Sequence, residues 1–106
     1  MEILLKKHAI LFVHGWATDG RVWKEHVDYF SQKRTVINMV LPGHGSEKKW
    51  DSKTIEPAVL AIKEAIEGYE GKTIGIGWSL GAQSLIASAA LNPGAFEKLV
   101  LVGATP

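Results

Sequence analysis

The sequence predicts an α/β fold, with a mostly parallel sheet and helices on its flanks. Four short apolar runs are typical of strands that a parallel sheet buries on both faces. These runs are Ala9–Val13, Thr35–Leu41, Thr73–Gly77 and Lys98–Gly103. Segments with helical periodicity separate them, and such an alternation indicates right-handed βαβ units. Residues Met1–Lys7 are a candidate for a further edge strand.

The first helical segment lies between the first two predicted strands. Trp23, Val27 and Phe30 are spaced by four and then three residues, which gives a helix one apolar face. Thr18 or Asp19 is available to cap its N-terminus, because either side chain can accept a hydrogen bond from a free backbone amide. We therefore expect one amphipathic helix packed on the sheet.

Two more helical segments precede the third and fourth strands. The first repeats apolar residues at Ile55, Val59, Ile62 and Ile66. Pro57 falls where a first helical turn tolerates proline, and Gly68 ends the run. The second covers Ser79–Asn92, is almost entirely small and apolar, and stops at Pro93-Gly94. An apolar surface nearly all round predicts that this last helix is buried.

Composition limits the kind of protein this can be. At 106 residues the chain is at most one domain, and its formal net charge is +1 with the basic residues scattered, which argues against a nucleic-acid partner. There is no cysteine, so disulfides, thiolate metal sites and cysteine nucleophiles are excluded. The longest apolar stretch near the start is five residues, too short for a signal peptide or a membrane span. We expect a cytoplasmic protein without metal or cofactor.

A candidate nucleophile lies between the third strand and the last helix. Gly77–Gly81 reads Gly-Trp-Ser-Leu-Gly and matches the pattern G-x-S-x-G. The serine of this pattern, Ser79, must occupy a tight, strained turn for its hydroxyl to stand clear of the sheet. Strand and helix approach so closely there that the flanking glycines cannot carry side chains. The alternative is a glycine-rich turn with an incidental serine, and the strand–helix context favours the nucleophile.

A candidate oxyanion loop follows the first strand. Acyl transfer needs two backbone donors at the developing oxyanion, and the amide after the nucleophile, that of Leu80, is one. Trp16, in His14-Gly15-Trp16, is placed to supply the other. We expect Gly15 to let the loop turn sharply towards the site. We interpret His14 as a structural histidine rather than a catalytic base, and Trp16 as lining an acyl pocket rather than filling the core.

A second histidine loop follows the second strand. Leu41–Ser46 reads Leu-Pro-Gly-His-Gly-Ser, which is turn chemistry because proline fixes φ and glycine permits positive φ. His44 would lie at the C-terminal edge of the sheet, where ligands bind in open α/β folds. Its structural interpretation is again the favoured one.

These motifs, in this order, resemble the α/β-hydrolase superfamily over nearly the whole chain. The matching segments are Phe12–Trp16, Leu41–Ser46, Gly77–Gly81 and Leu99–Gly103. The tryptophans of His-Gly-Trp and Gly-Trp-Ser-Leu-Gly are most similar to the pimeloyl-acyl-carrier-protein methyl ester esterases of biotin synthesis. Val40 stands where the family usually has aspartate, and one residue of the family's turn is missing between Gly45 and Ser46.

The resemblance implies a function and assigns roles. Ser79 would be the nucleophile of a carboxylesterase, with Trp16 and Leu80 as oxyanion donors, acting on a small-molecule or acyl-carrier-protein-linked ester. It also implies that residues 1–106 are the N-terminal portion of one hydrolase domain, without its cap and C-terminal part.

The catalytic acid and histidine are not evident. Serine needs a general base held by an acid, and in this superfamily both follow the nucleophile. After Ser79 the chain has no histidine and no aspartate, and Glu97 is its only carboxylate there. We therefore expect the 106 residues alone to be inactive. A non-catalytic scaffold or binding module, or an acyltransferase or thioesterase of the same fold, is the alternative.

The strand order implied by the resemblance leaves one strand exposed. The run Leu99–Val102 would be an edge of the sheet although it is apolar throughout, and an open apolar edge favours pairing between chains. We expect the chain to be marginally stable or to self-associate through this edge.

Overall fold

The computed structural model describes residues 8–44, 55–69 and 72–103, which form a four-stranded parallel sheet. The strand order is β2-β1-β3-β4, and each neighbouring pair is parallel. The strands are β1 (Ala9–Val13), β2 (Thr35–Met39), β3 (Thr73–Trp78) and β4 (Phe96–Val102). The predicted α/β class is confirmed, as is the neighbouring position of β1 and β3.

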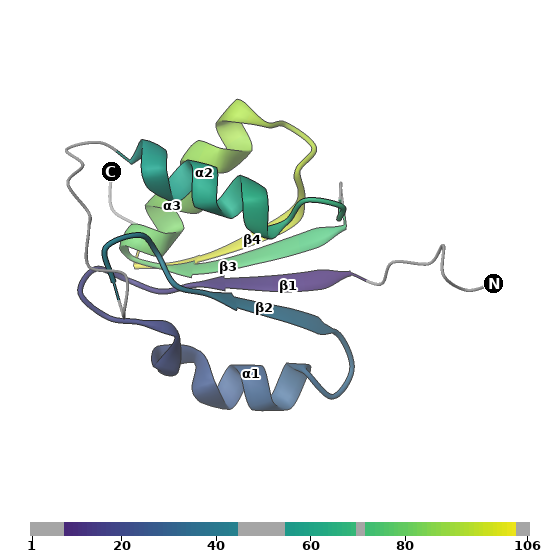
Figure 1. The fold of residues 1–106 in the computed structure, drawn as a ribbon. Helices are drawn as coiled ribbons and strands as arrows, with labels where there is room; N and C mark the ends of the chain where they lie inside the picture. Colours follow the sequence, from purple (N-terminus) through teal and green to yellow (C-terminus); the bar gives the residue numbers. More distant parts are fainter. Residues whose placement is uncertain (1–7, 45–54, 70–71, 104–106) are drawn as a thin grey trace.

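Helices cover both faces of this sheet. α2 (Glu56–Ala65) and α3 (Leu80–Leu91) lie on one face, and α1 (Lys24–Phe30) lies on the other (Figure 1). A short 3-10 helix, η2 (Gly20–Trp23), leads into α1. The single helix expected over this stretch is therefore two consecutive elements. Asp19 caps the first of them, because its carboxylate accepts a hydrogen bond from the Arg21 amide at 2.9 Å.

Strand β1 is the centre of the core because both of its faces are covered. Leu11 and Val13 join the cluster under α2 and α3, with Ile62 and Leu85 from those helices. Ile10 and Phe12 point the other way, against Trp23 and the helix α1 that follows it. All five residues of β1 are buried, so the expectation of a strand buried on both faces is confirmed here.

The outer strands and the last helix are less buried than their apolar sequences predict. β2 and β4 are the two edges of the sheet, and most of their residues are exposed or half-buried. α3 buries one face, which includes Ala82 and Leu85, and leaves Ile86 and Leu91 exposed. The expectation of a helix buried all round was wrong, because the described chain packs only the sheet and α2 against it. The proposed strand at Met1–Lys7 lies outside the described residues.

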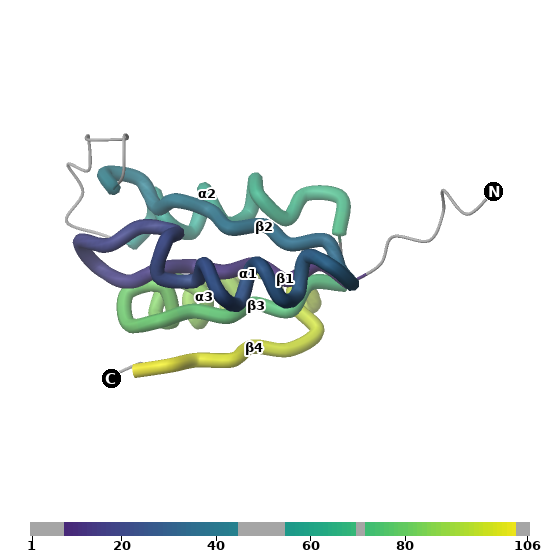
Figure 2. Tube along the Cα trace, turned by 90° about the horizontal axis from the view of Figure 1, so that it is seen from below, coloured from purple at the N-terminus to yellow at the C-terminus, as the bar shows by residue number. Residues whose placement is uncertain are grey.

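β4 is an edge strand of the sheet that the described residues form, and it carries apolar side chains. In Figure 2 it forms the outer margin of the sheet beyond β3. Leu99 packs into the cluster beneath α2 and α3, so the alternation of a strand puts Val100 and Val102 on the opposite face. There α1 and η2 pack mainly on β1 and β2, and both valines are exposed. None of the described helices combines the length and apolar character needed to cross a bilayer.

This edge strand yields a prediction about association. We expect the chain to sediment as dimers or larger species at high concentration, because unpaired backbone groups and apolar side chains coincide along β4. Val100→Lys should shift it to monomer, since a charge on an edge strand opposes pairing. Leu60→Lys, at an exposed position of α2, is the control and should not. A wild-type monomer with ordinary cooperative urea unfolding would contradict the prediction.

Candidate active site

Ser79 occupies a strained turn between β3 and α3. Its backbone angles are φ 56° and ψ −113°, and it is one of two non-glycine residues with positive φ in the described chain. Its amide donates to the Val102 carbonyl oxygen at 2.8 Å, which ties the turn to β4. Ser79 stands at the N-cap of α3, yet its hydroxyl makes no capping hydrogen bond. The strained backbone expected for a nucleophile elbow is confirmed.

The two glycines of the elbow are needed for different contacts. A β-carbon on Gly77 would lie 2.7 Å from the backbone of Gly81 and Ala82, so Gly77 lets the strand and its own helix meet. A β-carbon on Gly81 would instead collide with the carbonyl oxygens of Val13 and His14. The first turn of α3 is therefore packed directly against the end of β1. This brings the amide end of α3, where Leu80 is the first residue, beside the loop that carries Trp16.

The loop after β1 is a tight turn stabilised through the Gly15 carbonyl. That oxygen accepts hydrogen bonds from the Thr18 hydroxyl at 2.7 Å and the Thr18 amide at 3.2 Å, and His14 Nδ1 lies 2.8 Å from it. Positive φ falls on Ala17, at 62°, and not on Gly15. The loop turns sharply at Gly15, as expected, although the Gly15 backbone is not left-handed; its missing side chain also makes room for Trp78.

Trp16 lies at the surface of this loop. Its side chain is 64% exposed, and its ring meets that of His44 edge-on with centroids 5.3 Å apart. Such exposure rules out the core interpretation of Trp16. Its role as an oxyanion donor, like that of Leu80, stays a prediction.

His14 and His44 link the loops after β1 and β2 reciprocally. The Leu41 amide donates to His14 Nε2, and the Ala17 amide donates to His44 Nε2, each at 2.9 Å. A backbone amide can only donate, so each Nε2 carries a lone pair and each ring holds its proton on Nδ1. Nδ1 of His44 then lies 3.0 Å from the Pro42 carbonyl, as a donor should. The structural interpretation of both histidines is confirmed.

This hydrogen bonding leaves neither loop histidine free to act as a base. Both nitrogens of each ring are engaged by backbone groups, and the rings lie 5.0 Å apart. Burial is the main cause that lowers the pKa of His14, and the neighbouring His44 lowers it further, while the Gly15 carbonyl opposes the shift. His14 is therefore held neutral.

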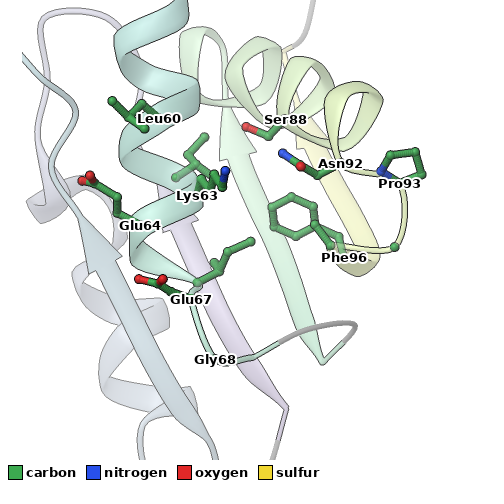
Figure 3. Close-up of a pocket in the computed structure, with 13 residues that line it drawn as sticks. Leu60, Lys63, Glu64, Glu67, Gly68, Ser88, Asn92, Pro93 and Phe96 are labelled. Atoms are coloured by element: carbon green, nitrogen blue, oxygen red, sulfur yellow. The ribbon is translucent and has the colours of Figure 1, made fainter.

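A sizeable groove of the described chain lies away from this site. It has a volume of about 640 Å³ and lies between the C-terminal ends of α2 and α3, with Lys63, Ser88 and Phe96 among its lining residues (Figure 3). Phe96 begins β4, whereas Val102, which bonds to Ser79, ends it. The groove thus lies near the N-terminal ends of the strands, whereas Ser79 lies at their C-terminal ends. Within the described ranges, no three side chains of histidine, aspartate or glutamate gather as metal ligands would.

Comparison with known proteins agrees with this geometry. The sequence profile of the "Alpha/beta hydrolase family" matches residues 10–106. The chain belongs to the alpha/beta hydrolase family. The pimeloyl-[acyl-carrier protein] methyl ester esterase of Methylococcus capsulatus is 32% identical over 100 residues, and that of Nitrosomonas europaea is 32% identical over 97. In both cases the match covers 92% of this chain and 37% of the relative, so the chain spans little over a third of their length.

Solved structures share the fold of this hydrolase chain. An epoxide hydrolase from Bacillus megaterium superposes with a TM-score of 0.81 at 22% identity, covering 93% of this chain and 36% of that one. An extracellular alpha/beta-hydrolase from a Paenibacillus species gives 0.80 at 20% identity, covering 93% and 42%. At these identities the likeness shows the fold alone.

One contact beside Ser79 was not predicted from the sequence. Trp78 occupies the variable position before Ser79 in the pentapeptide, and its ring contacts Gly15 in the loop after β1. A residue at a variable motif position gives no signal by itself. The tryptophans of the two motifs indicated a family, but nothing in the sequence pattern predicted that Trp78 packs against the loop after β1.

The strain at Ser79 predicts a difference between two substitutions. Ser79→Gly should be more stable than Ser79→Ala by about 1 kcal/mol or more, because only glycine adopts this backbone conformation without cost. At Ser84, in the interior of α3, the order should reverse, since glycine is the poorer helix former there. Urea unfolding of the four variants measures both differences. Equal stabilities at position 79 would contradict the strain.

The buried His14 predicts a pH dependence of stability. Its folded pKa lies below the ordinary 6.5, so the unfolded chain takes up the proton first as pH falls. Stability should then decline as pH falls through about 6.5, by at most about 1.4 kcal/mol per unit from this group. The pKa of Asp19 is lowered to about 2 by its bonds to Arg21, so the stability that this carboxylate contributes is present near neutral pH and is lost only as pH falls from about 4 towards 2, below the range in which His14 titrates. His14→Gln should make the free energy of unfolding less dependent on pH near pH 6. An unchanged pH dependence in this variant would show that His14 is not its cause.

Proposed function

We propose that this chain provides the nucleophile and the oxyanion site of a serine carboxylesterase. Ser79 is the nucleophile, and the backbone amides of Trp16 and Leu80 are the oxyanion donors. The observation that carries the proposal is the strained Ser79, with a hydroxyl free of any capping bond, at a helix end packed against the loop of Trp16. Strained non-glycine residues of this kind cluster at functional sites.

The proposed chemistry is a two-step acyl transfer. Ser79 Oγ attacks the carbonyl carbon of the ester while a general base takes its proton. The carbonyl oxygen becomes an oxyanion, which the two amides and the positive end of the α3 dipole stabilise. Collapse of this intermediate expels the alcohol and leaves the acyl group on Ser79. Water then attacks the acyl-enzyme and regenerates the hydroxyl.

The base and its acid are supplied, in this proposal, by residues other than those described. His14 and His44 have both ring nitrogens bound to backbone groups, and no histidine or aspartate follows Ser79 in the sequence. Residues 1–106 would then form the N-terminal portion of one hydrolase domain.

The relatives favour one class of substrate. They are pimeloyl-[acyl-carrier protein] methyl ester esterases, so we propose that the substrate is a methyl ester carried on an acyl-carrier protein, which water cleaves to methanol and a carboxylate. This would place the protein in biotin synthesis and in the cytoplasm. A thioesterase or acyltransferase would use the same nucleophile with another leaving group or acceptor.

A second candidate is a scaffold or binding module without catalysis. It is favoured by one observation, the absence of a free histidine beside Ser79 in the described chain. It would leave the strain at Ser79 without a purpose. If the protein is an esterase, supplying a general base should make Ser79 reactive; if it is a scaffold, a supplied base should have no effect.

The chain by itself should hydrolyse p-nitrophenyl butyrate only slightly above background. His14 and His44 have both ring nitrogens engaged by backbone groups and so are not free to serve Ser79 as a base, although oxyanion donors alone can leave weak catalysis. Because neither histidine acts as the base in this proposal, folded His14→Ala and His44→Ala variants should keep this residual rate. A fast reaction that either substitution abolishes would show that the loop histidine is the base.

The decisive test supplies the missing part. Joining this chain to the remainder of the Methylococcus capsulatus relative, beyond its matched segment, should give an esterase whose activity Ser79→Ala abolishes. Ser84→Ala, at a serine inside α3, is the control and should retain activity. A chimera that unfolds cooperatively but remains inactive would contradict the esterase and favour the scaffold.

A further inference from the structure

The indole of Trp78 lies between two loops at the C-terminal edge of the sheet. Trp78 ends β3, directly before Ser79, and is 37% exposed. Its ring is close to Gly15 in the loop after β1 and to Gly103 after β4. One side chain on the nucleophile strand therefore touches the connections that follow both neighbouring strands.

The contact with Gly15 is the tighter one. A β-carbon on Gly15 would lie 2.8 Å from Trp78 Cε3 and 3.2 Å from Cδ2 and Cζ3. The six-membered ring thus rests against the Gly15 backbone, with no room for a methyl group. On the other side, a β-carbon on Gly103 would be 3.5 Å from Cδ1 and 3.6 Å from Nε1, which is ordinary contact.

Gly15 matters because its carbonyl shares a peptide plane with the Trp16 amide. In a trans peptide the C=O and N–H point in opposite directions, so whatever orients one orients the other. Three donor atoms surround the Gly15 oxygen: the Thr18 hydroxyl, the Thr18 amide and His14 Nδ1. These bonds set the rotation of the plane. They do not by themselves set its distance from Ser79.

We propose that Trp78 is a positioning residue, whose indole fixes where the Trp16 amide stands relative to Ser79. The ring supports Gly15 from the nucleophile strand, so the oxyanion loop and the elbow keep one spacing. This inference rests on the proposed function for its catalytic meaning. The contact between Trp78 and Gly15 does not depend on the proposed function, and neither does the experiment that tests it.

The test uses hydrogen exchange in the 106-residue chain. The Thr18 amide reports on the loop because it bonds to the Gly15 oxygen. Trp78→Leu should raise its exchange rate on the order of tenfold, and should shift the Trp16 amide resonance, while amides inside α3 stay protected. Leu101→Ala, at a residue of similar exposure (38%) on the neighbouring strand, is the control and should leave Thr18 unchanged. Trp78→Phe, which keeps an aromatic ring, should restore most of the protection.

A double-substitution cycle separates positioning from general destabilisation. Gly15→Ala should destabilise the wild-type chain because its methyl meets the indole, and the cost should fall in the Trp78→Leu background. Additive effects, or a protected Thr18 amide in folded Trp78→Leu, would overturn the proposal. Neither the hydrogen-exchange rate nor the free energy of unfolding depends on catalysis. An inactive chimera would therefore contradict the proposed function without contradicting the positioning role of Trp78.

Discussion

The close approach of α3 to the ends of two strands is the constraint on which the site depends. Gly77 lets the helix turn back on its own strand, and Gly81 lets the first turn of the helix touch the carbonyls of Val13, which ends β1, and of His14, which follows it. Those contacts hold the chain in a path that only a strained residue can complete, and Ser79 completes it. The remaining features of the edge are arranged around this fixed junction.

The loops on either side are held by polar groups that look catalytic in the sequence. His14 and His44 each accept from the backbone of the other loop, and together they join the turn after β1 to the turn after β2. Buried amides would be costly without partners, so this use of imidazole stabilises two tight turns at once. The same bonds remove both rings from proton transfer. In our account the site therefore has preorganised donors and a nucleophile, and takes its base from elsewhere.

Much of this arrangement could be predicted because its signals are local. Apolar runs located β1 and β3, Asp19 was one of two caps proposed, and the spacing of glycines around Ser79 revealed the elbow. What the sequence could not predict depends on contacts between distant segments. The burial of α3 was overestimated because helix composition does not say what packs against it. Positive φ at Ala17, and the packing of Trp78 on Gly15, likewise depend on which loops meet.

The central claim is that the fold presents Ser79, among six serines, as a preorganised nucleophile. Reaction with a fluorophosphonate at alkaline pH tests it most directly, because hydroxide can take the serine proton when no histidine is present. The phosphonyl oxygen would then occupy the oxyanion site. Mass mapping of the adduct should place it on Ser79, with Ser79→Ala reducing labelling to background. Labelling spread over the other serines, or none at Ser79, would contradict the account.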